Sequence, residues 1–159
     1  MKTTITRLLT TSALLLAMSH SFAAGGSSGP AAAPDKLDTV RAQITAKNWP
    51  AAIDELKRIN ATGDADWNNL MGYSLRKGPT PDFAGAEKFY NEALRIDPSH
   101  RGALEYSGEL YLQTGNLSKA EQRLAVLDKE CTFGCEEYSD LKKAIAQYKA
   151  NGSKASSSY

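Results

Sequence analysis

The sequence has no excess of either charge and few residues that commonly bind metals or act as nucleophiles. It contains 19 Lys and Arg, 18 Asp and Glu, two histidines and two cysteines among 159 residues. A protein that binds nucleic acid more often shows a basic excess or a basic stripe, and neither is visible here. A glycine-rich phosphate-binding loop is also missing, and no serine or cysteine has an evident histidine partner. The sequence therefore predicts a protein that is not an enzyme, has no cofactor and does not bind nucleic acid.

An apolar run long enough to cross a membrane is absent too. The mostly apolar segment Leu8–Met18 is shorter than the ~20 residues that a spanning helix needs. It follows the basic residues Lys2 and Arg7, and Ser21–Ala23 offers small residues at the cleavage positions, which is typical of a secretory signal peptide. We therefore expect residues 1–23 to be a cleavable signal peptide, with a membrane anchor as the alternative. The mature protein is then expected in the bacterial periplasm or outside the cell, without a membrane span.

Cleavage after Ala23 would leave a nearly neutral chain. It removes two basic residues, so 17 basic residues face 18 acidic ones and no electrostatic partner is implied. It also removes His20 and leaves His100 as the only histidine. Residues 24–34 contain only small residues and proline, have nothing to bury, and are predicted to be a flexible linker.

The dominant pattern of the remaining chain is a period of 34 residues. Four columns of mostly apolar or small residues recur together at this interval: Trp49, Phe83 and Leu117; Ala52, Ala86 and Ala120; Leu56, Tyr90 and Leu124; Ile59, Ala93 and Leu127. A period of this length indicates stacked repeats, in which each unit is one supersecondary element that covers the apolar face of its neighbour.

Helical spacing of apolar residues fills each period, and alternating strand patterns are absent. Asn48, Asp82 and either Asp64 or Asp66 are expected to cap helices, and Asp97-Pro98 to end one. We predict an all-α fold with repeats at about residues 35–63, 64–98 and 99–131, within a domain of residues 35–150. An amphipathic helix at 136–150 is expected to cap the stack, and residues 151–159 to be a disordered tail.

This pattern resembles the tetratricopeptide repeat, a helix–turn–helix of 34 residues. The matching residues are Trp49, Ala52, Ile53 and Leu56 in the first repeat; Gly72, Phe83, Ala86, Tyr90, Ala93 and Pro98 in the second; and Ser107, Gly108, Tyr111, Gly115, Leu117, Ala120, Leu124 and Leu127 in the third. Gly72 and Gly108 are 36 residues apart, so two residues are inserted around Pro79–Pro81. The resemblance implies an α-solenoid of about three repeats plus the C-terminal capping helix.

The segment from Cys131 to Cys135 is the best candidate for chemistry. Two cysteines in an exported protein usually pair, and a disulfide here would join the last repeat helix to the capping helix. A redox-active pair is more often spaced by two residues. A third interpretation is a copper(I) or zinc site made by the two thiolates and His100, with Glu136 or Glu137 as a further ligand. The structural disulfide is favoured, and metal handling or thiol redox stays the alternative function. Glu136-Glu137 otherwise indicates a solvated helix face.

Proteins that resemble this repeat typically hold a peptide or a helix on the concave surface formed by the first helix of each repeat. Carried over to this sequence, the resemblance implies a binding groove lined by Arg41, Asn69, Tyr73, Arg76, Lys77, Glu105, Glu109 and Leu112. These side chains are expected to face away from the covered apolar stripe and to be free to bind. The sequence thus predicts a non-enzymatic scaffold that binds a protein or peptide of unknown identity. Self-assembly through the repeat ends is a further possibility.

Overall fold

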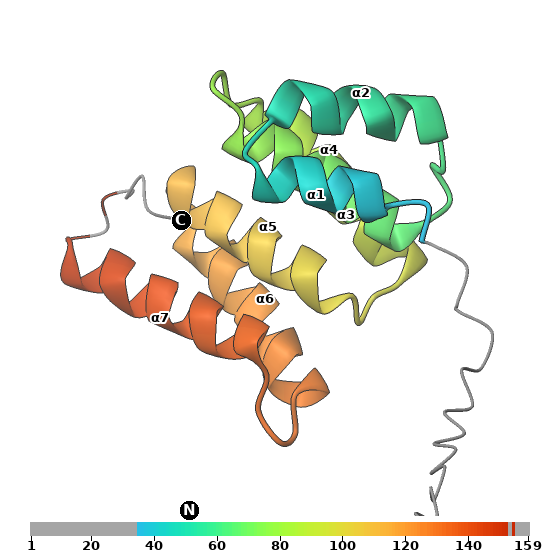
Figure 1. Ribbon diagram of the computed structural model, residues 1–159. Coiled ribbons are helices and arrows are strands. Elements are labelled where there is room, and N and C mark those ends of the chain that lie inside the picture. The colour runs from blue at the N-terminus through green and yellow to red at the C-terminus, as the bar shows by residue number, and fades with distance from the viewer. Residues whose placement is uncertain (1–34, 153, 155–159) are drawn as a thin grey trace, which may run out of the picture. The chain divides into compact units, whose positions relative to one another are not determined.

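The computed structural model describes residues 35–152 and 154, and this part of the chain contains seven α-helices and no strand (Figure 1). The predicted signal peptide (1–23), the linker (24–34) and most of the predicted tail (151–159) lie outside the described residues. The helices are α1 (Asp38–Thr45), α2 (Trp49–Ile59), α3 (Ala65–Lys77), α4 (Phe83–Ile96), α5 (Arg101–Gln113), α6 (Leu117–Glu130) and α7 (Glu136–Ala150). The all-α prediction is confirmed. Among the described helices, none is long and apolar enough to span a bilayer.

Side-chain caps start several of the helices, and two of these caps, Asp64 and Asp82, stand at predicted positions. Asp64, Asp82 and Asn116 each accept a hydrogen bond from the backbone N–H three residues later, over 3.1, 2.9 and 3.1 Å. Asn48 also precedes a helix, but its side chain makes no capping hydrogen bond. Pro50 stands in the first turn of that helix, and it removes one of the N–H groups that such a cap would bond.

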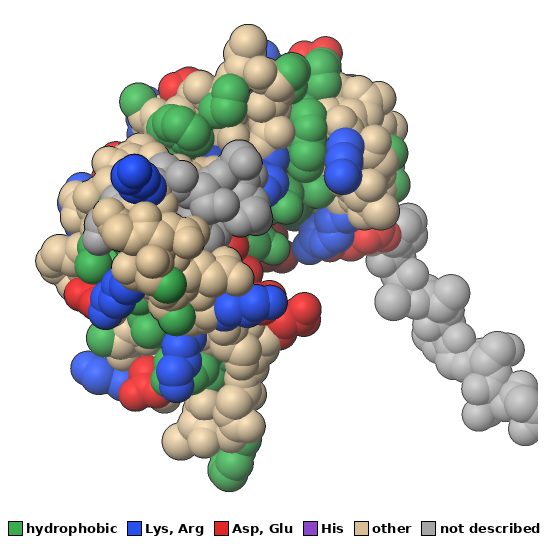
Figure 2. All heavy atoms as spheres, turned by 90° about the vertical axis from the view of Figure 1, so that its left-hand side faces the viewer, with side chains coloured by type: hydrophobic (Ala, Val, Ile, Leu, Met, Phe, Trp, Pro, Cys, Tyr) green, Lys and Arg blue, Asp and Glu red, His purple; other side chains and the backbone are tan. Residues whose placement is uncertain are grey.

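The helices form two layers in the described part of the chain. The odd-numbered helices α1, α3, α5 and α7, named the A helices below, each contact the next member of their series. The B helices α2, α4 and α6 cover them, because each B helix packs against the A helix before it and the A helix after it. Acidic and basic side chains are intermixed on the face shown in Figure 2, in line with the balanced composition.

Two glycines let neighbouring helices approach closely. A Cβ atom on Gly72 would lie 2.8 Å from Cε1 of Tyr90, and one on Gly108 would lie 2.6 Å from Cδ2 of Leu141. Both distances are far below ordinary van der Waals contact, so any larger residue would push the helices apart. Small residues at these positions therefore allow the close packing of the helices.

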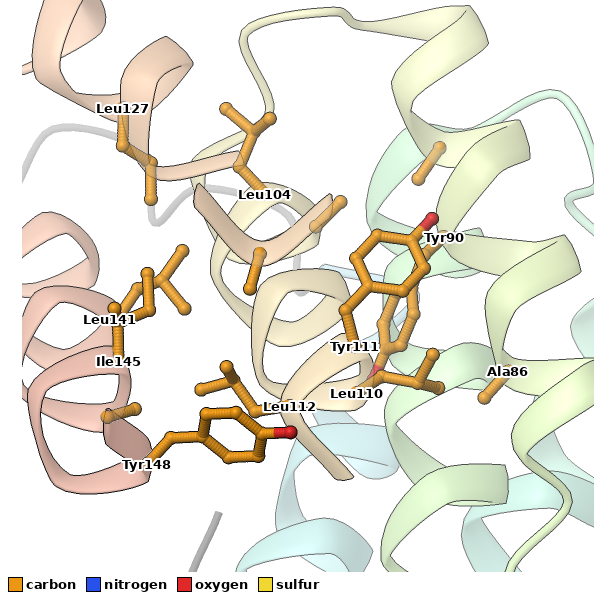
Figure 3. Close-up of a cluster of buried hydrophobic side chains, with 14 of the residues drawn as sticks. Ala86, Tyr90, Leu104, Leu110, Tyr111, Leu112, Leu127, Leu141, Ile145 and Tyr148 are labelled. Carbon is orange, nitrogen blue, oxygen red and sulfur yellow. The ribbon is translucent and has the colours of Figure 1, made fainter. Parts of the chain in front are cut away.

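The apolar side chains gather into two clusters. One lies mainly in α1, α2 and α3, around Val40, Leu56 and Trp67, and the other lies in α4 to α7. Leu75 is partly buried and packs against both clusters. Figure 3 shows the larger cluster, in which Leu141 on α7 faces the side chains of α5. Two cores joined at Leu75 therefore hold the described helices together.

The helix α7 buries a single apolar stripe, as the sequence predicts. Leu141, Ala144, Ile145 and Tyr148 are buried against α5 and α6. Lys142, Lys143 and Lys149 are exposed on the other side of the helix. An amphipathic helix with this arrangement covers the apolar face of the third repeat and presents charge to water.

Candidate functional site

The predicted groove residues all lie on A helices, but they differ greatly in exposure. Arg41, Tyr73, Lys77 and Glu109 are partly exposed. Asn69, Arg76, Glu105 and Leu112 are only 6%, 2%, 8% and 0% exposed. These four side chains expose little surface, because consecutive A helices pack directly against one another. The surface open to a ligand is narrower than the sequence predicts.

Leu112 belongs to the core and not to a groove. Figure 3 shows its side chain directed toward α7, beside Tyr148. The sequence prediction placed Leu112 on an open face because it did not place α7 against α5. The structure places α7 there, in the position of a further A helix, and this closes the C-terminal part of the predicted groove.

Arg76 is a buried residue of α3 that links this helix to α5 through hydrogen bonds. Its Nη2 donates a hydrogen bond to Oε2 of Glu109 over 2.7 Å, and its Nη1 donates one to Oε1 of Gln113 over 3.3 Å. Its guanidinium carbon lies 5.5 Å from the ring centre of Tyr73 and 5.8 Å from that of Tyr106. Ion pairing, hydrogen bonds and cation–π attraction together offset the cost of burying the charge. Arg76 therefore stabilises the packing of α3 against α5, and its guanidinium group is not available to a ligand.

Three half-buried aromatic residues lie near this arginine: Tyr73 and Tyr106 on the A helices α3 and α5, and Trp49 at the start of the B helix α2. The ring centres of Tyr73 and Tyr106 are 4.6 Å apart, and those of Trp49 and Tyr73 are 6.0 Å apart. Burial raises the pKa of both tyrosines, so each keeps a neutral phenol at physiological pH. We name Trp49, Tyr73 and Tyr106 the aromatic strip. It offers partly exposed ring surface on a rigid base, which suits contact with apolar or planar groups of another molecule.

The sequence analysis missed Tyr106. The period aligns Tyr73 with Glu109, because the inserted residues shift the register of the third A helix. Helical geometry still offered a signal, since Tyr106 precedes Glu109 by three residues and therefore lies on the same face of α5. A search for aromatic residues one turn away from each predicted groove position would have found it.

Comparison with known proteins relates part of the chain to a repeat family. Residues 81–145 match the model of the tetratricopeptide repeat. This part of the chain is therefore similar to tetratricopeptide repeats. Among solved structures, its fold is similar to that of PcrH in complex with the chaperone binding region of PopD. The TM-score is 0.57 at 19% sequence identity, and the similarity covers 73% of this chain and 90% of that chain. The search of curated proteins found none with significant similarity.

The inserted residues form one wall of an apolar pocket. The pocket has a volume of about 310 Å³ and lies between α2 and the end of α3. Its lining residues are Trp49, Pro50, Ile53, Asp54, Ser74, Leu75, Gly78, Pro79 and Thr80. Trp49 thus belongs both to this pocket and to the aromatic strip, so the insertion extends the apolar surface of the strip.

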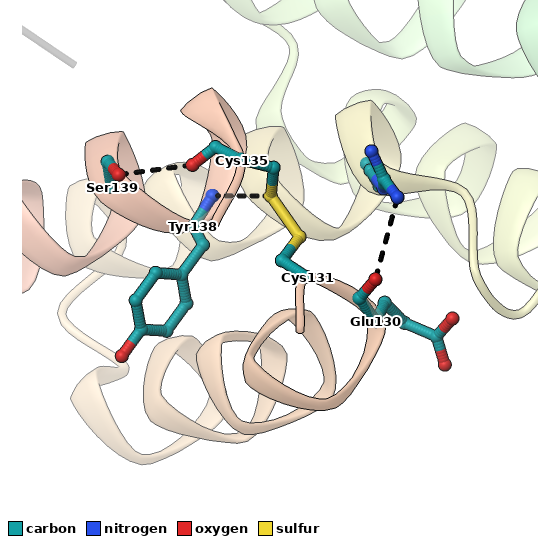
Figure 4. Close-up of a disulfide and its surroundings, with 6 residues drawn as sticks. Glu130, Cys131, Cys135, Tyr138 and Ser139 are labelled. Atoms are coloured by element: carbon teal, nitrogen blue, oxygen red, sulfur yellow. Dashed lines mark hydrogen bonds between the residues drawn. A yellow bond between two sulfur atoms is a disulfide. The ribbon is translucent and has the colours of Figure 1, made fainter. Parts of the chain in front are cut away.

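Cys131 and Cys135 are joined by a disulfide with an S–S distance of 2.06 Å (Figure 4). Cys131 follows the last residue of α6, and Sγ of Cys135 accepts a hydrogen bond from the backbone N–H of Tyr138 over 3.4 Å at the start of α7. The bond links the ends of two helices across an exposed turn. No free cysteine remains among the described residues.

His100 serves the fold at another place. Its Nδ1 accepts a hydrogen bond from the backbone N–H of Ala103 over 3.1 Å and caps α5. Its Nε2 lies 2.9 Å from Oδ1 of Asp66, which leaves this nitrogen as the donor. Both ring nitrogens of His100 thus have hydrogen-bond partners of their own, and the sulfurs of Cys131 and Cys135 are bonded to each other. These are the atoms that the copper or zinc interpretation would need as ligands. The described residues contain no group of three or more His, Cys, Asp or Glu arranged to hold a metal ion.

Proposed function

We propose that this protein binds a peptide or an unstructured protein segment on its A-helix face, as a non-enzymatic interaction module. The observation that carries the proposal is the aromatic strip, since partly exposed rings on a rigid base are the usual anchors of protein recognition. The similar fold of PcrH, which was solved with a region of PopD bound, supports the same kind of partner.

Rigidity of the base is the second part of the proposal. Tyr73 and Tyr106 stand on different A helices, and the buried pair of Arg76 and Glu109 fixes the distance between those helices. A site held in this way loses little conformational entropy when a segment binds, so more of the contact energy contributes to affinity. The neighbouring apolar pocket beside Trp49 gives the segment a second place to bury a side chain.

We also propose that the protein works in the periplasm or outside the cell. The signal-peptide pattern of residues 1–23 supports this location. The disulfide between Cys131 and Cys135 supports it independently, because such bonds persist in oxidising compartments. Separation of cell fractions with an antibody against the protein tests it, and a purely cytoplasmic signal would contradict it.

Site-specific photocrosslinking in the native cell envelope tests the binding proposal. A photoreactive benzoylphenylalanine replaces Tyr73 in one variant and Lys88, an exposed residue of α4, in the matched control. We expect the Tyr73 variant to form an adduct of defined mass that the Lys88 variant lacks, because only the first position lies on the A-helix face. Equal adducts at both positions, or none at Tyr73, would contradict the proposal.

A further inference from the structure

A second pocket opens between α5 and α7, and its walls are acidic. It has a volume of about 210 Å³ and is lined by Gly102, Glu105, Tyr106, Glu136, Glu137 and Asp140. We name it the acidic pocket. The sequence analysis assigned Glu136 and Glu137 to a solvated face, but the approach of α7 to α5 brings them together with Glu105.

Glu105 is the unusual member of this pocket. It is 8% exposed, and its carboxylate makes no hydrogen bond and no ion pair with any described residue. The cation that acts on the pKa of Glu105 is Arg76, which is already bound to Glu109 and Gln113. Buried carboxylates are rare unless they are paired, because removing the charge from water is costly. An unpartnered carboxylate at the floor of an open pocket therefore indicates a missing partner.

The charges that act on Glu105 come from α3, α5 and α7. Burial has the largest effect, and the carboxylates of Glu109 on α5 and of Asp140 and Glu137 on α7 add to it, while Arg76 on α3 acts in the opposite direction. The sum raises the pKa of Glu105 to about 8. Only a positive charge placed inside the pocket would restore the ordinary ionisation of this group.

The volume and the walls of the acidic pocket limit which positively charged group it can hold. The pocket is smaller than the roughly 300–1,000 Å³ of typical small-molecule sites, and its volume of about 210 Å³ suits one side chain of another molecule. The ring of Tyr106 offers an apolar wall for a methylene stem and a face for a cation. The positive end of the α7 dipole opposes a cation here, and the carboxylates of Glu136, Glu137 and Asp140 outweigh it.

We propose that the acidic pocket binds a lysine or arginine side chain of the segment held on the A-helix face. This inference rests on the proposed function and adds a specificity to it. Tyr106 belongs both to the aromatic strip and to the acidic pocket, so one segment can contact the two at once. The preferred segment then carries a basic residue next to the apolar or aromatic residue that contacts the strip.

Binding of such a cation is coupled to a proton. The free pocket keeps Glu105 largely protonated at neutral pH, whereas the bound cation favours the carboxylate. A proton therefore leaves as the side chain binds. Affinity is expected to rise with pH by at most about tenfold per unit up to about pH 8, and to level off above it.

A titration followed by NMR tests the pocket without a known partner. The probe is Nα-acetyl-arginine methylamide, added to the ¹⁵N-labelled, oxidised protein. Nα-acetyl-citrulline methylamide, which has the same shape and no charge, is the matched control. We expect saturable shifts of the Gly102, Tyr106 and Asp140 amides with the arginine probe only, with a Kd on the order of millimolar. The shifts should be larger at about pH 8.5 than at about pH 6.5.

Two variants make the test decisive. Glu105→Gln keeps the shape of the side chain, removes its charge and should abolish the pH dependence. Asp140→Asn changes an exposed residue of the same pocket and should weaken binding severalfold in a protein that folds normally. Three results would overturn the proposal. They are equal shifts with the citrulline probe, undiminished binding by both variants, and tighter binding of calcium ions, added as calcium chloride alone, at the same amides. Arginine binding without a crosslink at Tyr73 would support the pocket and reject the proposed function, and the reverse result would reject the pocket only.

Discussion

Arg76 and Glu109, which come from neighbouring repeats, form an ion pair of 2.7 Å in which the arginine side chain is wholly shielded from solvent. Glu109 keeps 15% of its side-chain surface, so the carboxylate forms the edge of the pair that faces water. The pair lies directly beneath Tyr73 and Tyr106. Stability of the fold and geometry of the aromatic strip therefore depend on the same contact.

Removal of the carboxylate should cost more than removal of the arginine. Glu109→Ala leaves a buried guanidinium with only Gln113 as an acceptor, and we expect a loss of about 2–4 kcal/mol in the free energy of unfolding. Arg76→Met removes the buried charge, keeps most of the volume, and should cost less. Urea unfolding of both variants measures the difference. A larger loss in Arg76→Met would show that the aromatic contacts of the arginine matter more than its charge.

Gly108 should tolerate no side chain. Gly108→Ala places a Cβ 2.6 Å from Leu141 and should destabilise the protein by about 1–3 kcal/mol through forced separation of α5 and α7. Gly63→Ala is the matched control, because nothing lies within 4 Å of its new Cβ, and it should change stability by less than about 0.5 kcal/mol. In a Leu141→Ala background the cost of Gly108→Ala should shrink. Chemical unfolding of the four variants checks this, and an unchanged cost in that background would argue against the steric explanation.

Reduction of the disulfide should loosen the start of α7. The bond closes a loop of five residues, for which chain entropy predicts a contribution of about 2 kcal/mol. Thermal unfolding with and without a reductant measures it, and the double variant Cys131→Ala/Cys135→Ala should not respond to the reductant. Phe133→Ala is the control inside the loop. This side chain is fully exposed, so the variant should keep the stability of the parent and its response to reduction.

Glu105 should make the protein less stable as the pH rises. The unfolded carboxyl group loses its proton near its ordinary pKa of 4.5, whereas the folded one keeps it up to about 8. Between these values the folded state binds more protons, so the free energy of unfolding falls with rising pH across this window. Glu105→Gln removes the effect and should be more stable than the parent by about 1–3 kcal/mol at about pH 9, with no such gain at about pH 4. Urea unfolding across this range checks it, and parallel pH profiles would contradict the pKa shift.

Most of the fold was predictable because its signals are local. The spacing of apolar residues, the caps at Asp64 and Asp82 and the Gly115-Asn116 turn each act within a few residues of the chain. The 34-residue period then indicates stacking, since a helix pair alone cannot bury its apolar face. The cap by His100 was missed, because histidine is an uncommon N-cap residue and this one is recognisable only from its contact with Ala103.

The candidate site was less predictable, because exposure depends on distances between helices that are far apart in sequence. Arg76 has the sequence context of a surface arginine on a helix, and only the approach of α5 buries it. Glu105 and Asp140 are 35 residues apart and meet at one pocket because α7 packs beside α5. Periodicity identifies which face a residue is on, but it does not identify how much of that face the next helix covers.

The two apolar clusters, which meet at Leu75, divide the described helices into two regions that we expect to open at different rates. Native-state hydrogen exchange should report two classes of slowly exchanging amides, one in α1 to α3 and a better protected one in α5 to α7. We expect the smaller N-terminal cluster to open first and to separate Tyr73 on α3 from Tyr106 on α5 as it does so. The aromatic strip is thus assembled only in molecules whose weaker half is closed, and a bound segment that contacts both rings would slow exchange in the N-terminal helices.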